Sequence, residues 1–300
     1  MKNQHLAAAV VLLGLAGFAT TAHLAAQAQQ RALYVTALDK SGNPVPELQP
    51  SDVVVKEDDA TREILRIAPA SEPMQVAIMV DNSQAAERFI RDYREALPAF
   101  ISAVLGDERV NGKHEIALIA LGERPTILSD YTSDPARLQK ATDRVFHASG
   151  SAVYFMDGVI EISQGITKRS SPRPVIVAII TEGPDLSSRH FRQVLEPLRT
   201  AGAALHVVTI GTPRNMEEDR SMVIDMGPKQ SGGSLSTILV GTALTGRLKQ
   251  LANEITHQFR VTYARPPRLI PPEKVTVTSK RPDLVLRGTA IDATRDQARP

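Results

Sequence analysis

Four short stretches of the chain are apolar at almost every position, and segments with helical spacing separate them. The stretches are Val76–Val80, Glu115–Leu121, Val175–Ile180 and Leu205–Ile210. After the first of them, Phe89, Tyr93, Leu97 and Ile101 recur at helical spacing. Strands that are apolar on both faces are typical of a parallel sheet covered by helices. We therefore predict an α/β fold with a doubly wound, mostly parallel sheet over residues 73–256.

The other helices and loops of this region are predicted from the same kind of pattern. Helices are expected over residues 134–145, 152–166, 188–200 and 244–256. Residues 211–233 are expected to form a long loop, and the charged run MEEDR at 216–220 is expected to be a solvated face of that loop.

Both flanks of this region have strand character. Residues 29–72 contain short strand patterns separated by turn signals. Residues 257–292 contain alternating strands at Phe259–Tyr263 and Lys274–Thr278. Because neither flank has enough strands to be stable alone, we predict that the two pack together as a small β-sandwich in which the α/β domain is inserted. Residues 293–300 are expected to be a disordered tail.

The first 28 residues are typical of a secretory signal peptide. Lys2 precedes the apolar stretch Leu6–Phe18, and Ala26-Gln27-Ala28 is a small-x-small cleavage signal. An uncleaved membrane anchor is the alternative, although the apolar stretch is short for a span of about 20 residues. We expect an exported mature chain, periplasmic or extracellular, with no membrane span once the leader is removed.

Composition narrows the range of functions. Lys and Arg number 35 and Asp and Glu 33, so the formal net charge is +2. Such a balance does not provide the concentrated basic surface of a nucleic-acid-binding protein. The chain has no cysteine, which excludes disulfides, thiolate metal sites and a cysteine nucleophile. It also has no nucleophile elbow, P-loop or G-x-G-x-x-G motif.

Oxygen-bearing side chains follow two of the apolar strands. Asp81 and Ser83 come directly after the first strand, and Glu182 follows the third. Ser151 lies between them, in a loop that opens an expected helix. Because the carboxyl ends of parallel strands meet at one edge of a sheet, we expect these loops to converge there. Such oxygens suit a hard cation, and the sequence therefore predicts an Mg²⁺ site at this edge.

The chain resembles a von Willebrand factor A domain in three runs: VAIMVDNSQAA from Val76, SGSAVY from Ser149 and VIVAIITEG from Val175. More narrowly, the order from signal peptide through β segment to the strand FRVTYARP is similar to that of secreted von Willebrand A-related proteins of acidobacteria and similar bacteria. The resemblance covers nearly the whole mature chain. It implies a doubly wound domain that binds proteins and is not an enzyme.

In that family, a metal-ion-dependent adhesion site takes its ligands from D-x-S-x-S and from a Thr and an Asp on two further loops. The resemblance places Asp81 and Ser83 on the first two ligands, Ser151 on the Thr and Glu182 on the Asp. Ala85 stands at the second Ser, so the pattern is degraded at three of its five positions. The alternative is that Asp81, Ser83 and Ser151 cap helices and that Glu182 is a solvated carboxylate.

Three functional hypotheses follow from these observations. The first is an exported adhesion-type module in which the carboxylate of a protein partner completes a weakened Mg²⁺ shell. The second is a metal-independent structural or interaction scaffold with a dead site. The third, a hydrolase using Ser and His, has no matching motif, although His147 precedes the Ser151 loop and is expected near the crevice.

Overall fold

The computed structural model describes residues 29–211, 217–267, 272 and 274–290. The predicted signal peptide at 1–28 and the predicted tail at 293–300 lie outside these residues. Within the described residues, no helix combines the length and the apolar character that crossing a membrane requires.

A six-stranded, mostly parallel sheet forms the centre of the larger part of the molecule, as predicted. Its strands are β5 (Gln75–Val80), β6 (Glu115–Ala120), β7 (Thr126–Thr132), β8 (Pro174–Thr181), β9 (Ala204–Ile210) and β10 (Leu235–Ile238). They lie in the order β10-β9-β8-β5-β6-β7, and only the pairing of β7 with β6 is antiparallel. The sequence prediction missed β7 and β10, because these edge strands are short or carry polar residues instead of a continuous apolar run.

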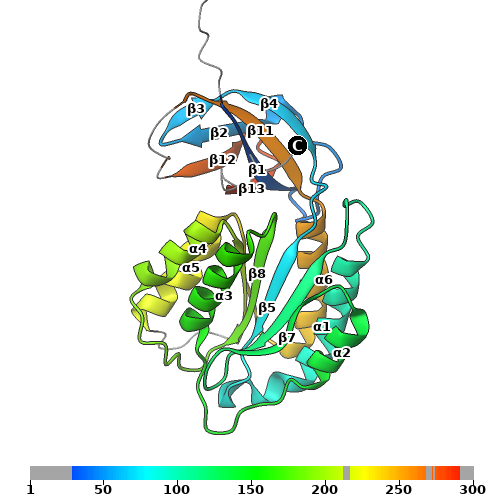
Figure 1. The fold of residues 1–300 in the computed structure, drawn as a ribbon, viewed down its shortest axis with the longest axis vertical. Helices are drawn as coiled ribbons and strands as arrows, with labels where there is room; N and C mark the ends of the chain where they lie inside the picture. The colour runs from blue at the N-terminus through cyan, green and yellow to red at the C-terminus, as the bar shows by residue number, and fades with distance from the viewer. Residues whose placement is uncertain (1–28, 212–216, 268–271, 273, 291–300) are drawn as a thin grey trace, which may run out of the picture.

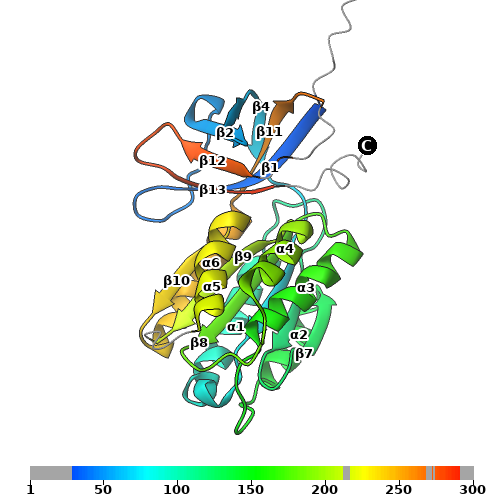
Figure 2. The same ribbon diagram turned by 90° about the vertical axis from the view of Figure 1, so that its left-hand side faces the viewer.

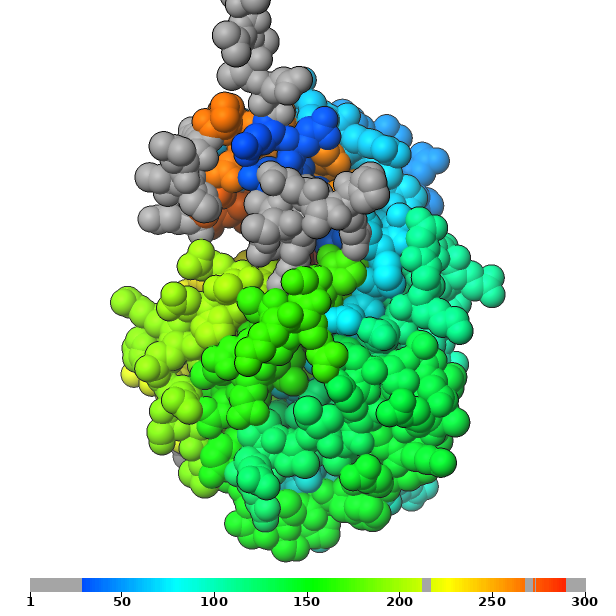
Figure 3. Space-filling view, in the orientation of Figure 1, coloured from blue at the N-terminus to red at the C-terminus, as the bar shows by residue number. Residues whose placement is uncertain are grey.

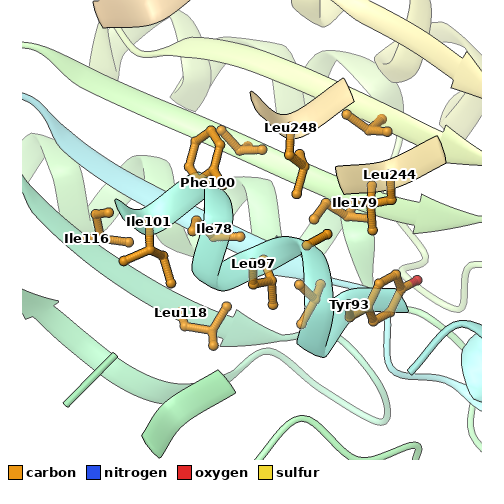
Figure 4. Close-up of a cluster of buried hydrophobic side chains, with 14 of the residues drawn as sticks. Ile78, Tyr93, Leu97, Phe100, Ile101, Ile116, Leu118, Ile179, Leu244 and Leu248 are labelled. Carbon is orange, nitrogen blue, oxygen red and sulfur yellow. The ribbon is translucent and has the colours of Figure 1, made fainter. Parts of the chain in front are cut away.

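Helices cover both faces of this sheet (Figure 1). One face carries α1 (Ile90–Leu105), α2 (Pro135–Asp143) and α6 (Leu244–Thr256), and the other carries α3 (Phe155–Arg169), α4 (Phe191–Ala201) and α5 (Glu218–Ser231). Short 3₁₀ turns lie at Pro50–Asp52, Gln84–Phe89 and Gly241–Ala243. In Figure 4, Tyr93, Leu97 and Phe100 of α1 pack with strand residues and with Leu244 and Leu248 of α6.

The prediction of a long loop over residues 211–233 was wrong, because α5 occupies most of that range. The helix was missed because its buried side includes Arg220 and Gly227 beside Val223 and Ile224, so no apolar period marks it. Gly227 packs closely on the sheet, since a Cβ there would lie 2.9 Å from a methyl of Leu205 and that side chain would have to shift. The prediction that the MEEDR run is a solvated face of a loop is also wrong for its last residue, because Arg220 is buried.

The terminal strands form the predicted sandwich of two antiparallel sheets (Figure 2). One sheet contains β1 (Gln29–Leu38), β4 (Ile64–Pro69), β11 (Phe259–Arg265) and β13 (Val285–Ala290), and the other contains β2 (Val53–Glu57), β3 (Ala60–Arg62) and β12 (Val275–Ser279). β1 pairs with both β11 and β13, so strands from the two ends of the chain share one sheet. Their apolar faces enclose a core of their own, which includes Leu33, Val35, Val55 and Val261.

The sandwich lies at the amino ends of the parallel strands, and their carboxyl ends point away from it (Figure 1). In the space-filling view the sandwich and the α/β part form the two ends of the molecule (Figure 3). Arg173, directly before β8, is buried between the two parts. It donates to the carbonyls of Glu72 and Ile255 and to the side chain of Gln258, where the chain crosses from one part to the other. The carboxyl edge of the sheet is therefore left to loops alone.

Candidate functional site at the carboxyl edge of the sheet

Four loops meet at the carboxyl edge of the sheet, and Asn82 joins three of them. Its Oδ1 accepts a hydrogen bond from the Gly122 N–H at 2.7 Å, and its Nδ2 donates to the Phe146 carbonyl at 2.8 Å. Its own carbonyl accepts from the Ala148 N–H at 2.8 Å. Asn82 thus ties the loops after β6 and after α2 to the end of β5. An amide that offers both an acceptor and two donors is suited to this bridging role.

Asp81 ends β5 and is completely buried. Its Oδ1 accepts from the Ser83 N–H at 2.9 Å, and its Oδ2 accepts from the N–H and the hydroxyl of Thr181 at 3.0 and 2.5 Å. These contacts bring the ends of β5 and β8 together, as expected for neighbouring parallel strands. They also satisfy the buried carboxylate, because hydrogen bonds compensate for the loss of water.

Neither serine of the predicted site caps a helix. The Ser83 side chain makes no capping hydrogen bond to the turn that follows it, and its buried Oγ has no partner among the described residues. Ser151 donates its hydroxyl to the Ala148 carbonyl at 2.7 Å, which closes a tight turn. The helix after it begins only at Phe155. The capping interpretation is therefore wrong for Ser83 and Ser151, and it is wrong for Asp81, whose carboxylate binds Ser83 and Thr181.

Glu182 lies at the surface in an ion pair with Arg88. The Arg88 Nη2 is 3.1 Å from Glu182 Oε1, and the two side chains are 64% and 34% exposed, so water screens the pair. Together with Gln84, Ala85 and Glu87, they line an open depression of about 560 Å³. Glu182 is thus an ion-paired carboxylate at the rim of the depression. This arrangement is close to the alternative in which Glu182 is a solvated carboxylate and not a metal ligand.

A buried arginine lies directly beneath these loops. The Arg220 side chain donates through Nη2 to the Thr181 carbonyl at 2.7 Å and through Nη1 to the Gly183 carbonyl. Its Nε is 4.0 Å from Asp185 Oδ2. Burial lowers the pKa of Arg220, whereas the nearby carboxylates of Asp185 and Asp81 act to raise it. Burial also raises the pKa of Asp185. A protein guanidinium therefore already supplies positive charge beside Asp81.

These contacts bear on whether the residues fit a divalent cation. Mg²⁺ needs several oxygens free to face one point in an octahedral shell. Ser83 Oγ meets that need, but both carboxylate oxygens of Asp81 already accept hydrogen bonds, the Ser151 hydroxyl donates to Ala148 and Glu182 is paired with Arg88. Among the residues that the structure describes, no three His, Cys, Asp or Glu side chains gather as a metal site. As arranged, the residues do not complete an Mg²⁺ shell, and the Mg²⁺ site stays a prediction from the sequence.

His147 reaches the same edge, in an arrangement that does not activate a nucleophile. Its Nε2 lies 3.2 Å from Ser149 Oγ and 3.7 Å from Glu87 Oε1. A serine–histidine–acid relay needs the hydroxyl and the carboxylate on opposite ring nitrogens. Here both approach the same nitrogen, so the geometry gives no support to a serine hydrolase.

Large apolar side chains are exposed around this edge. Phe146 is 60% exposed and lies under the Arg94 guanidinium, 4.5 Å from the ring centre. Leu186, in the loop after β8, is 56% exposed, and Ile127, just after the turn from β6, is 62% exposed. The backbone of Leu186 is fixed by a hydrogen bond to the Val153 carbonyl. Three large apolar side chains at the carboxyl edge are thus exposed to water.

Asn82, Thr181 and Arg220 also belong to this site, although the sequence did not predict them as members. Asn82 could have been found, because it lies between two candidate ligands at a strand end. Thr181 could have been found in the same way, since it directly precedes Glu182. Arg220 carried no such signal, because it belongs to a segment that was expected to be a loop and its partners are backbone carbonyls.

Solved structures share this architecture. No protein-family model matches the chain, and no curated protein matches it. A von Willebrand factor type A structure from Catenulispora acidiphila aligns over 88% of this chain and 74% of its own, with 12% identity and a TM-score of 0.50. Proximal thread matrix protein 1 from the mussel byssus, solved with a zinc-occupied metal-ion-dependent adhesion site motif, aligns over 70% of this chain and 50% of its own, with 14% identity and a TM-score of 0.50. The chain therefore has a von Willebrand factor A-like fold, as the resemblance implied.

Proposed function

We propose that the protein is an exported, non-enzymatic module that binds a protein partner at the carboxyl edge of its sheet, without a metal ion. Within the proteins of this fold, we propose that it belongs with the secreted von Willebrand A-related proteins that its sequence resembles. A matrix protein of the mussel byssus has a similar fold.

The exposure of Phe146, Leu186 and Ile127 at the carboxyl edge of the sheet carries this proposal. Exposed apolar groups that gather at one place on a surface are typical of protein interfaces, and aromatic residues are enriched there. Loops that a rigid scaffold positions are also the usual carriers of binding residues. The hydrogen bonds of Asn82 give these loops such a scaffold, because they fix the Phe146 backbone to β5.

The partners already present around Asp81 support binding without a metal ion. Arg220 and Thr181 compensate the buried carboxylate, and Arg88 compensates Glu182. A partner would then be held by apolar contact and by polar groups of the rim such as Gln84 and Glu87, instead of by a shared cation.

A comparison of matched variants tests the proposal. Immobilised mature protein is incubated with extract of the source cells, and captured proteins are identified and quantified for wild type, for Phe146→Ala/Leu186→Ala and for Leu65→Ala/Val285→Ala. The last pair removes residues that are 44% and 55% exposed on the sandwich. We expect a partner retained by the wild type and the sandwich variant but lost by the edge variant, with equal yield in Mg²⁺ and in EDTA.

Two results would contradict the proposal. Equal capture by all three proteins would show that the carboxyl edge is not the binding surface. Capture that disappears in EDTA and returns with Mg²⁺ would favour the metal-dependent hypothesis. Export is tested separately by fractionation and by N-terminal sequencing of the mature chain, which should begin at Gln29.

A further inference from the structure

β10 is the last strand of the central sheet, and its outer side is open. It pairs in parallel with β9 on its inner side, and no other described strand pairs with it. Figure 2 shows it at the margin of the sheet. Edge strands are usually protected from further pairing by charges, prolines or bulges. The opposite edge, β7, has such protection, since its pairing with β6 is irregular and Asp130 forms an ion pair with Arg169.

The β10 edge lacks these protections. Residues 230–246 contain no charged residue and no proline. Leu235 is 43% exposed at the start of the strand, and Leu239 is 73% exposed just after its end. Thr237, halfway between them, is also exposed. The charge that touches the strand is Arg247, which donates to Ser236 Oγ and is paired with Glu254 in a largely buried position. A short strand with apolar residues in water and no unpaired charge on it is a template for pairing with another strand.

The backbone hydrogen bonds define which residues face outward. The Ser234 carbonyl accepts from the Val207 N–H, and the Ile238 carbonyl accepts from the Gly211 N–H. Because backbone groups alternate sides along a strand, even-numbered residues face β9. The N–H and C=O groups of Leu235 and Thr237 therefore point to the open side, and their side chains share one face of the sheet. Leu239 follows in a bend just after the strand ends.

We propose that a second copy of this chain pairs with the β10 edge, antiparallel, about a two-fold axis through Thr237. In that register Thr237 lies opposite Thr237 of the second copy as a hydrogen-bonded pair, and Leu235 lies opposite the exposed Leu239 that follows the strand. Each exposed leucine then packs against the other exposed leucine across the axis. A two-fold interface must be complementary to itself, and a segment without charge places no like charges opposite one another.

Sedimentation over a concentration series from micromolar to submillimolar tests the association. We expect wild type to shift from monomer to dimer, and Thr237→Lys to stay monomeric because it places two ammonium groups opposite each other. Thr126→Lys makes the same change at an exposed threonine on the opposite edge and should dimerise like wild type. Melting curves check that both variants fold. The proposal would be overturned if wild type stayed monomeric over the whole concentration series. It would also be overturned if Thr237→Lys formed dimers as stable as those of wild type.

A cross-linking experiment tests the register, because the chain has no cysteine of its own. Residues in a hydrogen-bonded antiparallel pair have Cα atoms about 5.5 Å apart, which a disulfide can span. Under mild oxidation, Thr237→Cys should give a covalent dimer. Leu235→Cys should not, because its mate is Leu239, and Thr126→Cys should not either. A dimer through Leu235→Cys but not through Thr237→Cys would reject this register.

Discussion

A buried arginine lies at each end of β8. Both side chains donate hydrogen bonds to backbone carbonyls, but they stabilise different parts of the molecule. At the amino end, Arg173 makes four hydrogen bonds to the carbonyls of Glu72 and Ile255 and to the amide oxygen of Gln258. At the carboxyl end, Arg220 donates to the carbonyls of Thr181 and Gly183. The planar guanidinium suits both places, because it can donate to several fixed acceptors at once.

The surroundings of the two arginines differ. Arg173 is bonded to neutral oxygens, and burial lowers its pKa to about 10. It joins the two places where the chain passes between sandwich and α/β part, and the amide of Gln258 continues the contact to Thr36 of β1. Arg220 instead lies near the carboxylates of Asp81 and Asp185 and holds a single loop. The amino end thus fixes two parts of the molecule to each other, whereas the carboxyl end fixes a surface that is open to a partner.

The largest effect is expected from Arg173→Ala. The change leaves the oxygens of Glu72, Ile255 and Gln258 buried without their donor, so the free energy of unfolding should fall by about 3–5 kcal/mol. Urea denaturation followed by circular dichroism measures the loss. Arg169→Ala is the matched control, since that arginine pairs with Asp130 at the surface and should change stability by only about 0.5 kcal/mol.

A loss below about 1 kcal/mol for Arg173→Ala would mean that the junction does not depend on this side chain. The sandwich and the α/β part would then be held by the remaining contacts, such as the hydrogen bond of Thr289 to the Ser231 carbonyl and the ion pair of Arg287 with Glu254. In that case Arg173 and Arg220 would differ only in where they lie, and not in what they stabilise.

The sequence predicted the buried strands better than the loops at the carboxyl edge. Strands such as Val76–Val80 and Val175–Ile180 were predictable because burial on both faces requires apolar residues throughout. The approach of Asp81 to the end of β8 followed from parallel pairing, and Asp81 indeed accepts from Thr181. The orientation of Ser151 and the pairing of Glu182 with Arg88 could not be predicted, because they depend on loop conformations. Arg173 and Arg220 gave no periodic signal, since each donates to acceptors on segments far away in the sequence.

Asp81→Ala is expected to have the second largest effect and tests the carboxyl end. It removes the acceptor of three buried donors, so the free energy of unfolding should fall by about 2–4 kcal/mol. If the guanidinium of Arg220 and the hydroxyl of Thr181 suffice to balance Asp81, the wild-type melting temperature is the same in millimolar Mg²⁺ and in EDTA. A ligand that binds only the folded state must raise it.

The control for this variant is Asp130→Ala, which removes an exposed carboxylate from β7 and should leave the melting temperature nearly unchanged. A rise of the wild-type melting temperature with Mg²⁺, lost in Asp81→Ala, would show that the carboxyl end holds a metal ion after all. The two ends of β8 would then differ in their source of positive charge.

A third, smaller effect concerns His206, which is buried in β9 and bonded through Nδ1 to Ser234 Oγ at 2.9 Å. Burial, followed by the cations Arg287 and Arg247, holds its pKa well below the usual value. The unfolded chain therefore takes up a proton as pH falls through about 6.5 while the folded chain does not, so stability is lost toward acid by up to about 1.4 kcal/mol per pH unit. Denaturation at pH 7.5, 6 and 5 measures this slope.

His206→Gln keeps a hydrogen-bonding side chain without a titratable ring and should flatten the slope over that range. His190→Gln, at the exposed start of α4, is the matched control and should leave the slope as it is in wild type. If His206→Gln and wild type lose stability in parallel, other groups must carry the acid sensitivity. One such group is His114, whose pKa burial also lowers.

The smallest effect on stability is expected from Arg88→Ala, at the surface of the carboxyl end. The ion pair of Arg88 with Glu182 is exposed and screened, so its loss should change the free energy of unfolding by about 0.5 kcal/mol or less. A double-mutant cycle with Glu182→Ala measures the coupling of the pair. A coupling above about 1 kcal/mol would mean that the rim is organised by this pair and not only by Asn82 and Arg220. A small coupling leaves Arg88 and Glu182 free to exchange their pairing for contacts with a partner, which the buried arginines at either end of β8 cannot do.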